Sequence, residues 1–535
     1  MKKISFPILL LSLFISLSIN LKIVIERSLD NFIYNFHINF YFLCKVGIVC
    51  LLLYLLLFFL FMLFDRISLK NTKMIISKKF KIIIFLLFFI PTIIYLLSHY
   101  PGVFLNDTLF MLYHPVSKMN PVIYGMFISI LFFSIKVFFS STTTVFVLSI
   151  IQSIISCLIL CYGVIWFNKK INNKILTIIL ICYYSLLPII SNYNMSLDKD
   201  TPFSILMLLF FIFVFEIVES KGKIITNKIF LIKLILISIL CIFIRRNGII
   251  LIVGTLIILF LLYGFHNQKK YWIITILLLM LLPGVESIAL GYWNRSYNKS
   301  EAYAIPIQQV GYLVKYYPNK LSSGDYNFLS KIIKNPKETF KNNYNVYGVD
   351  EIKFNDNFDK DGFNKHEKEF LSLWISKFPN NVSGYMKSLI LNDYHLWSID
   401  FLEKGQSIFV IGSNYGIDRD KQIHNKRILP KGIYNFLVKY YDIFNTYLNP
   451  ACCFILLMLT NVYAYIRKKK DVLIISLPLI VLWIVLMLGT PLSSALRYMA
   501  PYLYILPIIM LYTFSITRED DANENTRKSK RKLSK

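Results

Sequence analysis

The chain has 535 residues; 56% belong to the hydrophobic set, 16% are charged, and 58 Lys and Arg against 30 Asp and Glu give a formal net charge of +28. A soluble domain has roughly a quarter of its residues charged, so this composition excludes an ordinary soluble globular protein. The apolar residues come in runs of about 17–25, which match the thickness of a bilayer's hydrocarbon core. We therefore predict an all-α polytopic membrane protein.

Thirteen segments are long and apolar enough to be candidate membrane helices. They run over 4–25, 46–64, 82–98, 122–140, 144–167, 175–191, 202–219, 229–244, 249–265, 271–290, 449–466, 472–489 and 498–516. The first follows Lys2 and Lys3 as a signal peptide would, but no small-x-small cleavage pattern precedes Glu26. We interpret this segment as an uncleaved anchor.

Lys and Arg gather in short connections, which by the positive-inside rule face the cytoplasm. The rich connections are Lys2-Lys3, 65–81, 169–174, 221–228, Lys269-Lys270, 467–470 and the tail from Arg518. All of these connections can lie on the cytoplasmic side of the membrane only if one of the candidate segments between residues 99 and 168 does not cross the bilayer. Segment 122–140 follows Asn120-Pro121 and is expected to be re-entrant or interfacial. This predicts about twelve crossings with both termini cytoplasmic; in the alternative, 122–140 crosses and one basic connection faces outward.

Domain organisation follows from this topology. We predict an N-terminal two-helix membrane region (1–81), a membrane core (82–290), an extracytoplasmic, mainly helical domain (291–447), C-terminal membrane helices (448–516) and a basic cytoplasmic tail (517–535). Within the extracytoplasmic domain, Phe370, Leu373 and Trp374 follow a helical period. The eight cysteines lie in or beside membrane segments, so neither a disulfide framework nor a cysteine metal site is expected.

Several cations break the positive-inside rule, because this topology puts them on the outer side: Lys199, Arg245, Arg246 and Arg497. Each lies at the end of an apolar helix, where a desolvated cation is best explained by an anionic partner. A phosphate group at the outer bilayer face would be such a partner. The alternative is that each cation snorkels or pairs with a neighbouring acid such as Asp198, Asp200 or Glu286.

Two acids are candidate catalytic residues on the same side. Asp107 follows the Pro101-Gly102 turn just beyond a membrane helix, where a carboxylate can act as general base for a hydroxyl acceptor. The alternative is that Asn106-Asp107-Thr108 only caps a helix. Asp200, two residues before Pro202 at a helix start, has the same two interpretations.

Other reaction classes lack their sequence motifs. No histidine has ligand spacing with a second His or Cys, so no transition-metal site is expected. The chain has no GxxxxGK[ST], GxGxxG or GxSxG motif, so nucleotide-driven transport and an α/β-hydrolase are not supported. Because the basic residues line the predicted cytoplasmic face, the net charge does not indicate nucleic acid as a partner.

An ordered set of short motifs between about 85 and 510 resembles the multi-spanning glycosyltransferases of the C type (GT-C). The motifs are Tyr100-Pro101-Gly102 with Asp107, Asn120-Pro121 to Tyr124, Lys199-Asp200, Arg246-Asn247-Gly248, Glu301 to Gln309, Val349 to Lys353 and Leu371 to Trp374. That superfamily includes oligosaccharyltransferases, protein mannosyltransferases and lipid A aminoarabinose transferases. More closely, the chain resembles an uncharacterised bacterial family of polytopic proteins assigned to it.

The resemblance implies a polyprenyl-phosphate sugar donor used on the outer face of the bacterial plasma membrane. It implies catalytic roles for Asp107, from the first outer loop, and for Asp200, at a later helix start. Relatives often have His-Pro where this chain has Asn120-Pro121, so no histidine is given a role. We expect the phosphate to contact the cations Lys199, Arg245, Arg246 and Arg497, and we expect Glu301, Gln308 and Gln309 to contact acceptor or donor.

These expectations name the partners as well as the activity. The partners are membrane lipid, the polyprenyl-phosphate sugar as co-substrate and an envelope glycan, lipid or protein as acceptor. No resident cofactor and no metal-binding residues are predicted, and the sequence does not decide whether the reaction uses a divalent metal. One alternative is an envelope polysaccharide polymerase, which shares many spans, outward arginines and a large outer loop. The other is a non-enzymatic lipid or glycan transporter, which typically shows repeat symmetry and ionisable residues near the bilayer midplane.

Overall fold

The computed structural model describes residues 2–30, 40–66, 74–103, 106–116, 121–264, 268–293, 299–346, 348–399, 428–489 and 496–515. Within these ranges the regular structure is helical, apart from two isolated bridges that pair Ile333 with Phe358 and Asn345 with Gly348. Each of the thirteen predicted segments falls mainly on helix over its described residues, although the helix within 122–140 ends at Lys136. The all-α prediction is confirmed for this part of the chain.

Outside residues 299–397 the structure contains the following helices: α1 (Lys2–Asp30), α2 (Phe40–Arg66), α3 (Lys78–Ser98), α4 (Asn106–Tyr113), α5 (Val122–Lys136), α6 (Ser141–Ile171), α7 (Lys174–Leu186), α8 (Pro188–Met195), α9 (Asp200–Glu219), α10 (Lys228–Ile244), α11 (Gly248–Tyr263), α12 (Lys269–Met280), α13 (Leu282–Tyr292), α22 (Lys431–Tyr447), α23 (Pro450–Ile466), α24 (Lys470–Ile475), α25 (Leu477–Gly489) and the helix Leu496–Ser515, whose first turn is η5 (Leu496–Met499). Six described stretches are long and apolar enough to cross a membrane, or seven if α7 and α8 form one bent span. The protein is therefore membrane-embedded.

Helix α9 is the centre of the bundle. About 72% of its apolar span is buried, against 22% for α2. Helix α2 instead leaves Leu51, Leu52 and Phe59 about 60% exposed, as expected of side chains that face lipid tails. The N-terminal residue of α9 is Asp200, so this central helix carries a predicted site residue into the interior.

Three of the predicted continuous segments are broken helices. The α7–α8 pair bends by 60° at Leu187, and Pro188 opens α8. Pro283 lies at the start of α13 and Pro478 at the start of α25. Proline cannot donate a backbone hydrogen bond and its ring clashes with the preceding turn, so each break coincides with a signal that is already present in the sequence.

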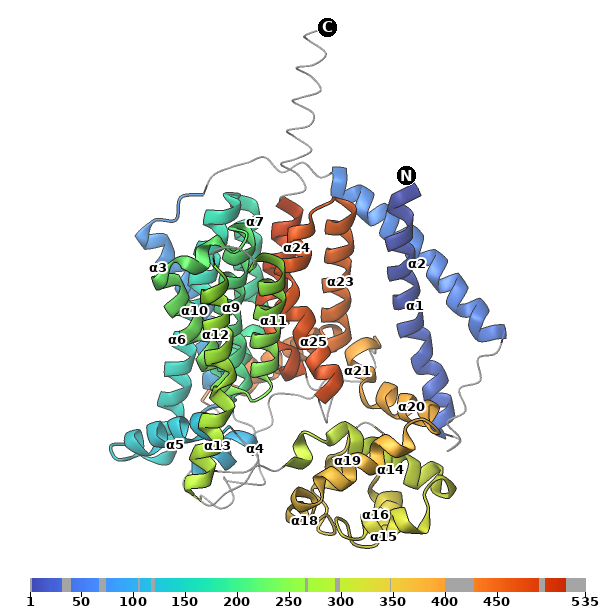
Figure 1. Cartoon of the computed structure of the whole chain (residues 1–535). Helices are drawn as coiled ribbons and strands as arrows, with labels where there is room; N and C mark the ends of the chain where they lie inside the picture. Colours follow the sequence, from blue (N-terminus) through green and yellow to red (C-terminus); the bar gives the residue numbers. More distant parts are fainter. Residues whose placement is uncertain are drawn as a thin grey trace.

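Residues 299–397 form a second unit with its own hydrophobic core. Its helices are α14 (Ala304–Tyr316), α15 (Ser323–Leu329), α16 (Pro336–Asn343), α17 (Asp350–Lys353), α18 (Lys360–Lys365), α19 (Glu367–Lys377), α20 (Val382–Asn392) and α21 (Tyr394–Trp397). As the helical period predicts, α19 buries Phe370 and Leu373. Figure 1 shows this α14–α21 domain at the end of the bundle where α4 and α5 lie, with α5 running across the bundle axis.

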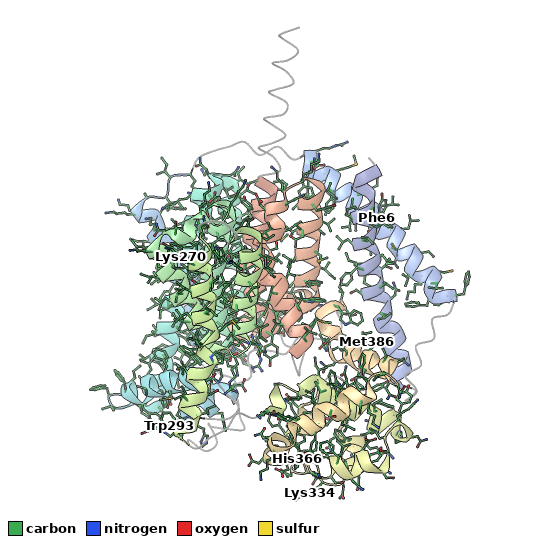
Figure 2. The ribbon with its side chains drawn as sticks, in the orientation of Figure 1. Phe6, Lys270, Trp293, Lys334, His366 and Met386 are labelled. Atoms are coloured by element: carbon green, nitrogen blue, oxygen red, sulfur yellow. The ribbon has the colours of Figure 1, made fainter. Side chains whose placement is uncertain are left out.

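The short helix α21 joins this domain to the bundle. The indole Nε1 of Trp483 on α25 donates to the Leu396 carbonyl at 3.0 Å. On α1, the Ser18 hydroxyl donates to the Trp397 carbonyl, and the Ser398 hydroxyl donates to the Ser18 carbonyl at 2.8 Å. Figure 2 places Met386 on the side of the domain nearest the bundle and Lys334 on the far side.

Asp393 lies at this joint and is fully buried. Its Oδ1 accepts a hydrogen bond from Asn392 Nδ2 at 2.7 Å, and its Oδ2 has no hydrogen-bond partner among the described residues. Burial raises the pKa of this carboxyl to about 8. In the unfolded chain an aspartate ionises near pH 4, so the folded state loses stability as pH rises from about 4 to about 8.

We therefore predict that Asp393→Asn raises the thermal midpoint, by a few degrees or more at pH 8 and by less at pH 5, because the amide cannot ionise. Thermal unfolding of the purified protein at the two pH values measures the effect. The matched control is Asp356→Asn at an exposed position of the same domain, which should leave both midpoints unchanged. A gain of equal size at both pH values would contradict the explanation.

Candidate functional site

Two loops are fastened together at the end of the bundle that carries α5. The backbone N–H of Leu197 donates to the Val103 carbonyl at 2.8 Å, and the Ser196 hydroxyl donates to the same carbonyl at 3.4 Å. On α6, the side-chain amide of Gln152 donates to the Ser196 carbonyl. These bonds hold the segment before α4 against the segment before α9, so Asp107 and Lys199 are brought close.

Gly102 lets the first of these loops pass close to α6. Its φ is +153°, and a Cβ at this position would clash with the Ser149 hydroxyl oxygen. The Pro-Gly turn that the sequence indicates is therefore also a steric requirement, because a larger residue would push the loop away from α6.

The predicted acids and cations meet in pairs at this point. Lys199 Nζ lies 2.9 Å from Asp107 Oδ2, and Arg245 Nη1 lies 3.1 Å from Asp200 Oδ1. The side chain of Asp200 is fully buried and that of Arg245 is 11% exposed. A buried carboxylate without a nearby cation would be strongly destabilising. The ion pair with Arg245 therefore offsets the cost of burying the Asp200 charge at the start of α9.

Arg497 links the two pairs into one group. Its Nη1 lies 3.9 Å from Asp107 Oδ2 and its Nε lies 3.8 Å from Asp200 Oδ2. We call Asp107, Lys199, Asp200, Arg245 and Arg497 the ion-pair cluster. Its members come from α4, the start of α9, the α10–α11 turn and η5, which are far apart in the sequence.

Both arginines of this cluster lie close to the ring of Tyr498. The guanidinium carbons of Arg245 and Arg497 lie 4.8 Å and 4.9 Å from its centroid. The Tyr498 hydroxyl also accepts a hydrogen bond from Arg497 Nη2 at 3.0 Å. Cation–π contacts of this kind let two guanidinium groups lie near each other in a partly dry environment. The sequence places Tyr498 directly after Arg497, but its role was not predicted.

Arg246, in contrast, turns toward α13. Its Nε lies 3.5 Å from Glu286 Oε1, and the same carboxylate oxygen accepts a hydrogen bond from the Val122 N–H at 2.6 Å. The alternative considered for each of these cations, a pair with a neighbouring acid, is what the structure contains for Arg246 with Glu286, and also for Arg245 with Asp200. Through Glu286, Arg246 helps to fix the start of α5.

Electrostatics give the Asp107 carboxyl an unusual acidity. The nearby Lys199 ammonium, assisted by Arg497, holds its pKa at about 2. A general base works best when its pKa is near the working pH, so Asp107 is a weak proton acceptor while Lys199 stays beside it. An anion that drew Lys199 away would raise this pKa again.

The residues expected to contact substrate from the α14–α21 domain are engaged inside it. Gln308 Nε2 donates to the Asn345 carbonyl at 2.5 Å, and Gln309 Nε2 donates to the Tyr385 carbonyl at 3.1 Å. Gln309 Oε1 also accepts from the Trp374 indole at 2.7 Å. Both glutamines are buried and help to pack the domain, so a contact with substrate stays a prediction. The side chain of Glu301 lies outside the described residues.

Sequence reasoning missed one carboxyl of the site. Asp198, one residue before Lys199, was considered only as an ion-pair partner, yet it lies among the members of the ion-pair cluster and is 2% exposed. The Asp-Lys-Asp pattern was the available signal. Among the described residues, no group of three His, Cys, Asp or Glu side chains is arranged to hold a metal ion.

The Arg245–Asp200 pair predicts a clear stability effect. Arg245→Ala should lower the free energy of unfolding by about 3–5 kcal/mol, because it leaves a buried carboxylate unpaired. Adding Asp200→Asn should restore part of the loss, since the unpaired charge is then gone. Denaturant titration measures the double-mutant cycle. Lys331→Ala, which removes an exposed pair at 3.9 Å, is the control and should cost less than about 1 kcal/mol; equal losses for both variants would contradict the argument.

Comparison with known proteins identifies the family of the chain. No curated protein and no solved structure matches it. The family of unknown function DUF6020 matches residues 46–528, a range that includes every member of the ion-pair cluster and the whole α14–α21 domain. Because this match covers most of the 535 residues, the chain belongs to the DUF6020 family.

Proposed function

We propose that the protein is a membrane glycosyltransferase of the GT-C type that transfers a sugar from a polyprenyl-phosphate donor to a cell-envelope acceptor on the outer face of the bacterial plasma membrane. One observation carries the proposal. Asp107 and Asp200 meet Lys199, Arg245 and Arg497 in one partly buried group at the end of the bundle. The resemblance to GT-C enzymes singles out the two acids, and the charge pattern singles out the three cations.

The chemistry of sugar transfer needs both kinds of charge. The acceptor oxygen attacks the anomeric carbon, the bond from that carbon to the phosphate oxygen breaks, and the phosphate leaves with the electron pair. Arg497, Arg245 and Lys199 are suited to stabilise this leaving charge, because charge-assisted bonds to phosphate are worth roughly 1.5–3 kcal/mol each. In the free protein these cations form ion pairs with carboxylates. We therefore propose that the donor phosphate, when it binds, replaces some of the carboxylates as the partner of these cations.

The membrane topology is part of the proposal. We infer about twelve crossings, with both termini in the cytoplasm and the α14–α21 domain outside. Support comes from the position of Lys270, at the end of α12 that lies away from this domain, whereas Trp293, just beyond α13, lies on the side of the domain (Figure 2). The transverse course of α5 supports the view that 122–140 does not cross (Figure 1).

A transporter is the second candidate, and one observation favours it. The broken α7–α8 pair lies beside the ion-pair cluster, and discontinuous helices form the substrate sites of many transporters. Against this reading, the charged residues of the cluster lie at helix ends rather than in the middle of a span. A transfer assay separates the two functions.

We predict that purified protein in lipid nanodiscs transfers label from a radiolabelled polyprenyl-phosphate sugar to an envelope acceptor fraction. Arg497→Lys should lower the rate at least about tenfold, because a lysine cannot hold two oxygens in the fork of a guanidinium. Lys331→Ala, far from the cluster, should keep the wild-type rate. Absence of transfer by the wild type would contradict the proposed function, and long polymeric products would indicate the polymerase instead.

We also predict the sidedness of two exposed lysines that Figure 2 labels. In intact cells a membrane-impermeant maleimide should label Lys334→Cys, on the α14–α21 domain, above the background of the eight natural cysteines. It should label Lys270→Cys only after the cells are permeabilised. The opposite pattern would contradict the proposed orientation, and equal labelling of both positions in intact cells would contradict a fixed topology.

A further inference from the structure

We propose that Asp198, rather than Asp107, takes the proton from the acceptor hydroxyl during sugar transfer, and that Asp107 serves to hold Lys199. This inference rests on the proposed function and assigns the proton transfer to a particular carboxyl. It begins from the arrangement of three carboxyls, Asp107, Asp198 and Asp200, which share one site but have different partners.

The backbone around Asp198 is fixed. Its N–H donates to the Ser196 carbonyl at 2.9 Å, and its own carbonyl accepts from the Thr201 N–H at 3.1 Å. The preceding residue, Leu197, is tied to Val103 of the loop that leads to Asp107. The Asp198 carboxyl is therefore held at the junction of the two loops, as a proton acceptor must be if it is to meet a bound hydroxyl.

The three carboxyls differ in what neutralises them. Asp107 has Lys199 at 2.9 Å, and Asp200 has Arg245 at 3.1 Å. Asp198 Oδ1, although buried, has no hydrogen-bond partner among the described residues. Both oxygens of Asp200 also lack a hydrogen bond, but each lies within 4 Å of an arginine. Asp198 has no such ion pair among the described residues, so of the three carboxyls it is the one without a cation of its own.

Charged and titratable groups surround Asp198 on every side. Asp200 and Lys199 follow it in sequence, Asp107 faces it from α4, Arg497 from η5, Tyr124 from α5 and Tyr193 from α8. Burial, assisted by the charge of Asp200, raises the pKa of Asp198 to about 7, while Arg497 opposes this shift. A carboxyl with this acidity can both accept a proton and release it again near neutral pH.

Unpaired polar groups next to Asp198 point to a polar ligand at the same place. The hydroxyl of Tyr193, which interacts electrostatically with Asp198 and Asp200, is buried without a hydrogen-bond partner in the described structure. On the same helix, both polar side-chain atoms of Asn192 are also buried and unpartnered. They lie on α8, whose eight residues are all buried and which leads directly into the loop of Asp198. Buried polar groups without partners are unfavourable, and the hydroxyls of a sugar or an alcohol acceptor would satisfy them.

The proposed step balances as follows. The acceptor oxygen forms a bond to the anomeric carbon of the donor sugar, and the bond between this carbon and the phosphate oxygen breaks. The phosphate leaves with that electron pair beside Lys199 and Arg497. The proton of the acceptor hydroxyl goes to Asp198 Oδ1, and the neutral carboxyl later releases it to water, so no oxidant or further reactant is needed.

The test is a pH profile of sugar transfer in nanodiscs, with the labelled polyprenyl-phosphate sugar as donor. For the wild type, kcat/KM should rise with pH and level off above about 7, because Asp198 must lose its proton first. Asp198→Asn should lower kcat at least 100-fold and leave KM for the donor within about threefold. Asp198→Glu should restore part of kcat with a shifted midpoint, which a purely structural role would not explain.

Asp107→Asn and Asp356→Asn complete the experiment. Asp107→Asn should raise KM for the donor and keep the pH midpoint near 7, and Asp356→Asn, exposed on the α14–α21 domain, should behave as the wild type. If the wild type transfers sugar and Asp198→Asn keeps its rate and midpoint, the role of Asp198 is overturned while the proposed function stands. If Asp107→Asn instead abolishes the pH dependence of kcat/KM, the proton acceptor is Asp107. If the wild type transfers no sugar, the proposed function fails and the inference with it.

Discussion

The buried carboxylate of Asp200 is the constraint on which the site depends. It lies at the first turn of α9, the most buried of the long apolar helices, where the helix dipole favours a negative charge. That preference alone does not offset the cost of burying a charge, so cations must lie close. Arg245 and Arg497 supply them from segments about 45 and 300 residues away along the chain. The α10–α11 turn and η5 are thus drawn to the same end of the bundle.

The opposite end of α9 is fixed in a similar way. Glu216 accepts a hydrogen bond from the Trp166 indole at 2.8 Å and pairs with Lys170 at 3.0 Å. Lys170 also pairs with Glu219. Both ends of the central helix are therefore held by ion pairs, and the apolar stretch between them is packed on nearly all sides. This gives the loops at the Asp200 end a rigid base, which a site that discriminates between ligands needs.

The cluster combines stability with a capacity to bind. Each cation of the cluster is paired in the free protein, so none of its positive charges is left without a counter-ion in a partly dry environment. The two ion pairs of Arg497 are long, since its nitrogens lie 3.8–3.9 Å from the carboxylate oxygens of Asp107 and Asp200. An arginine at these distances can turn to a phosphate without a large loss. Under the proposed function, the pairs and the contacts of both guanidinium groups with the Tyr498 ring keep the cations in place until the donor arrives.

The sequence by itself determined the class of the protein, because helices must satisfy their own backbone in lipid and the apolar runs can be counted. It also indicated which ionisable residues are exceptional, since under the predicted topology Lys199, Arg245 and Arg497 break the positive-inside rule. Only the tertiary structure decided which of these residues meet. Pairing between α4, α9, α10–α11 and η5 depends on packing over hundreds of residues, which no local pattern encodes. The same packing turned Arg246 to Glu286, engaged Gln308 and Gln309 inside their own domain, and buried Asp198 among opposing charges.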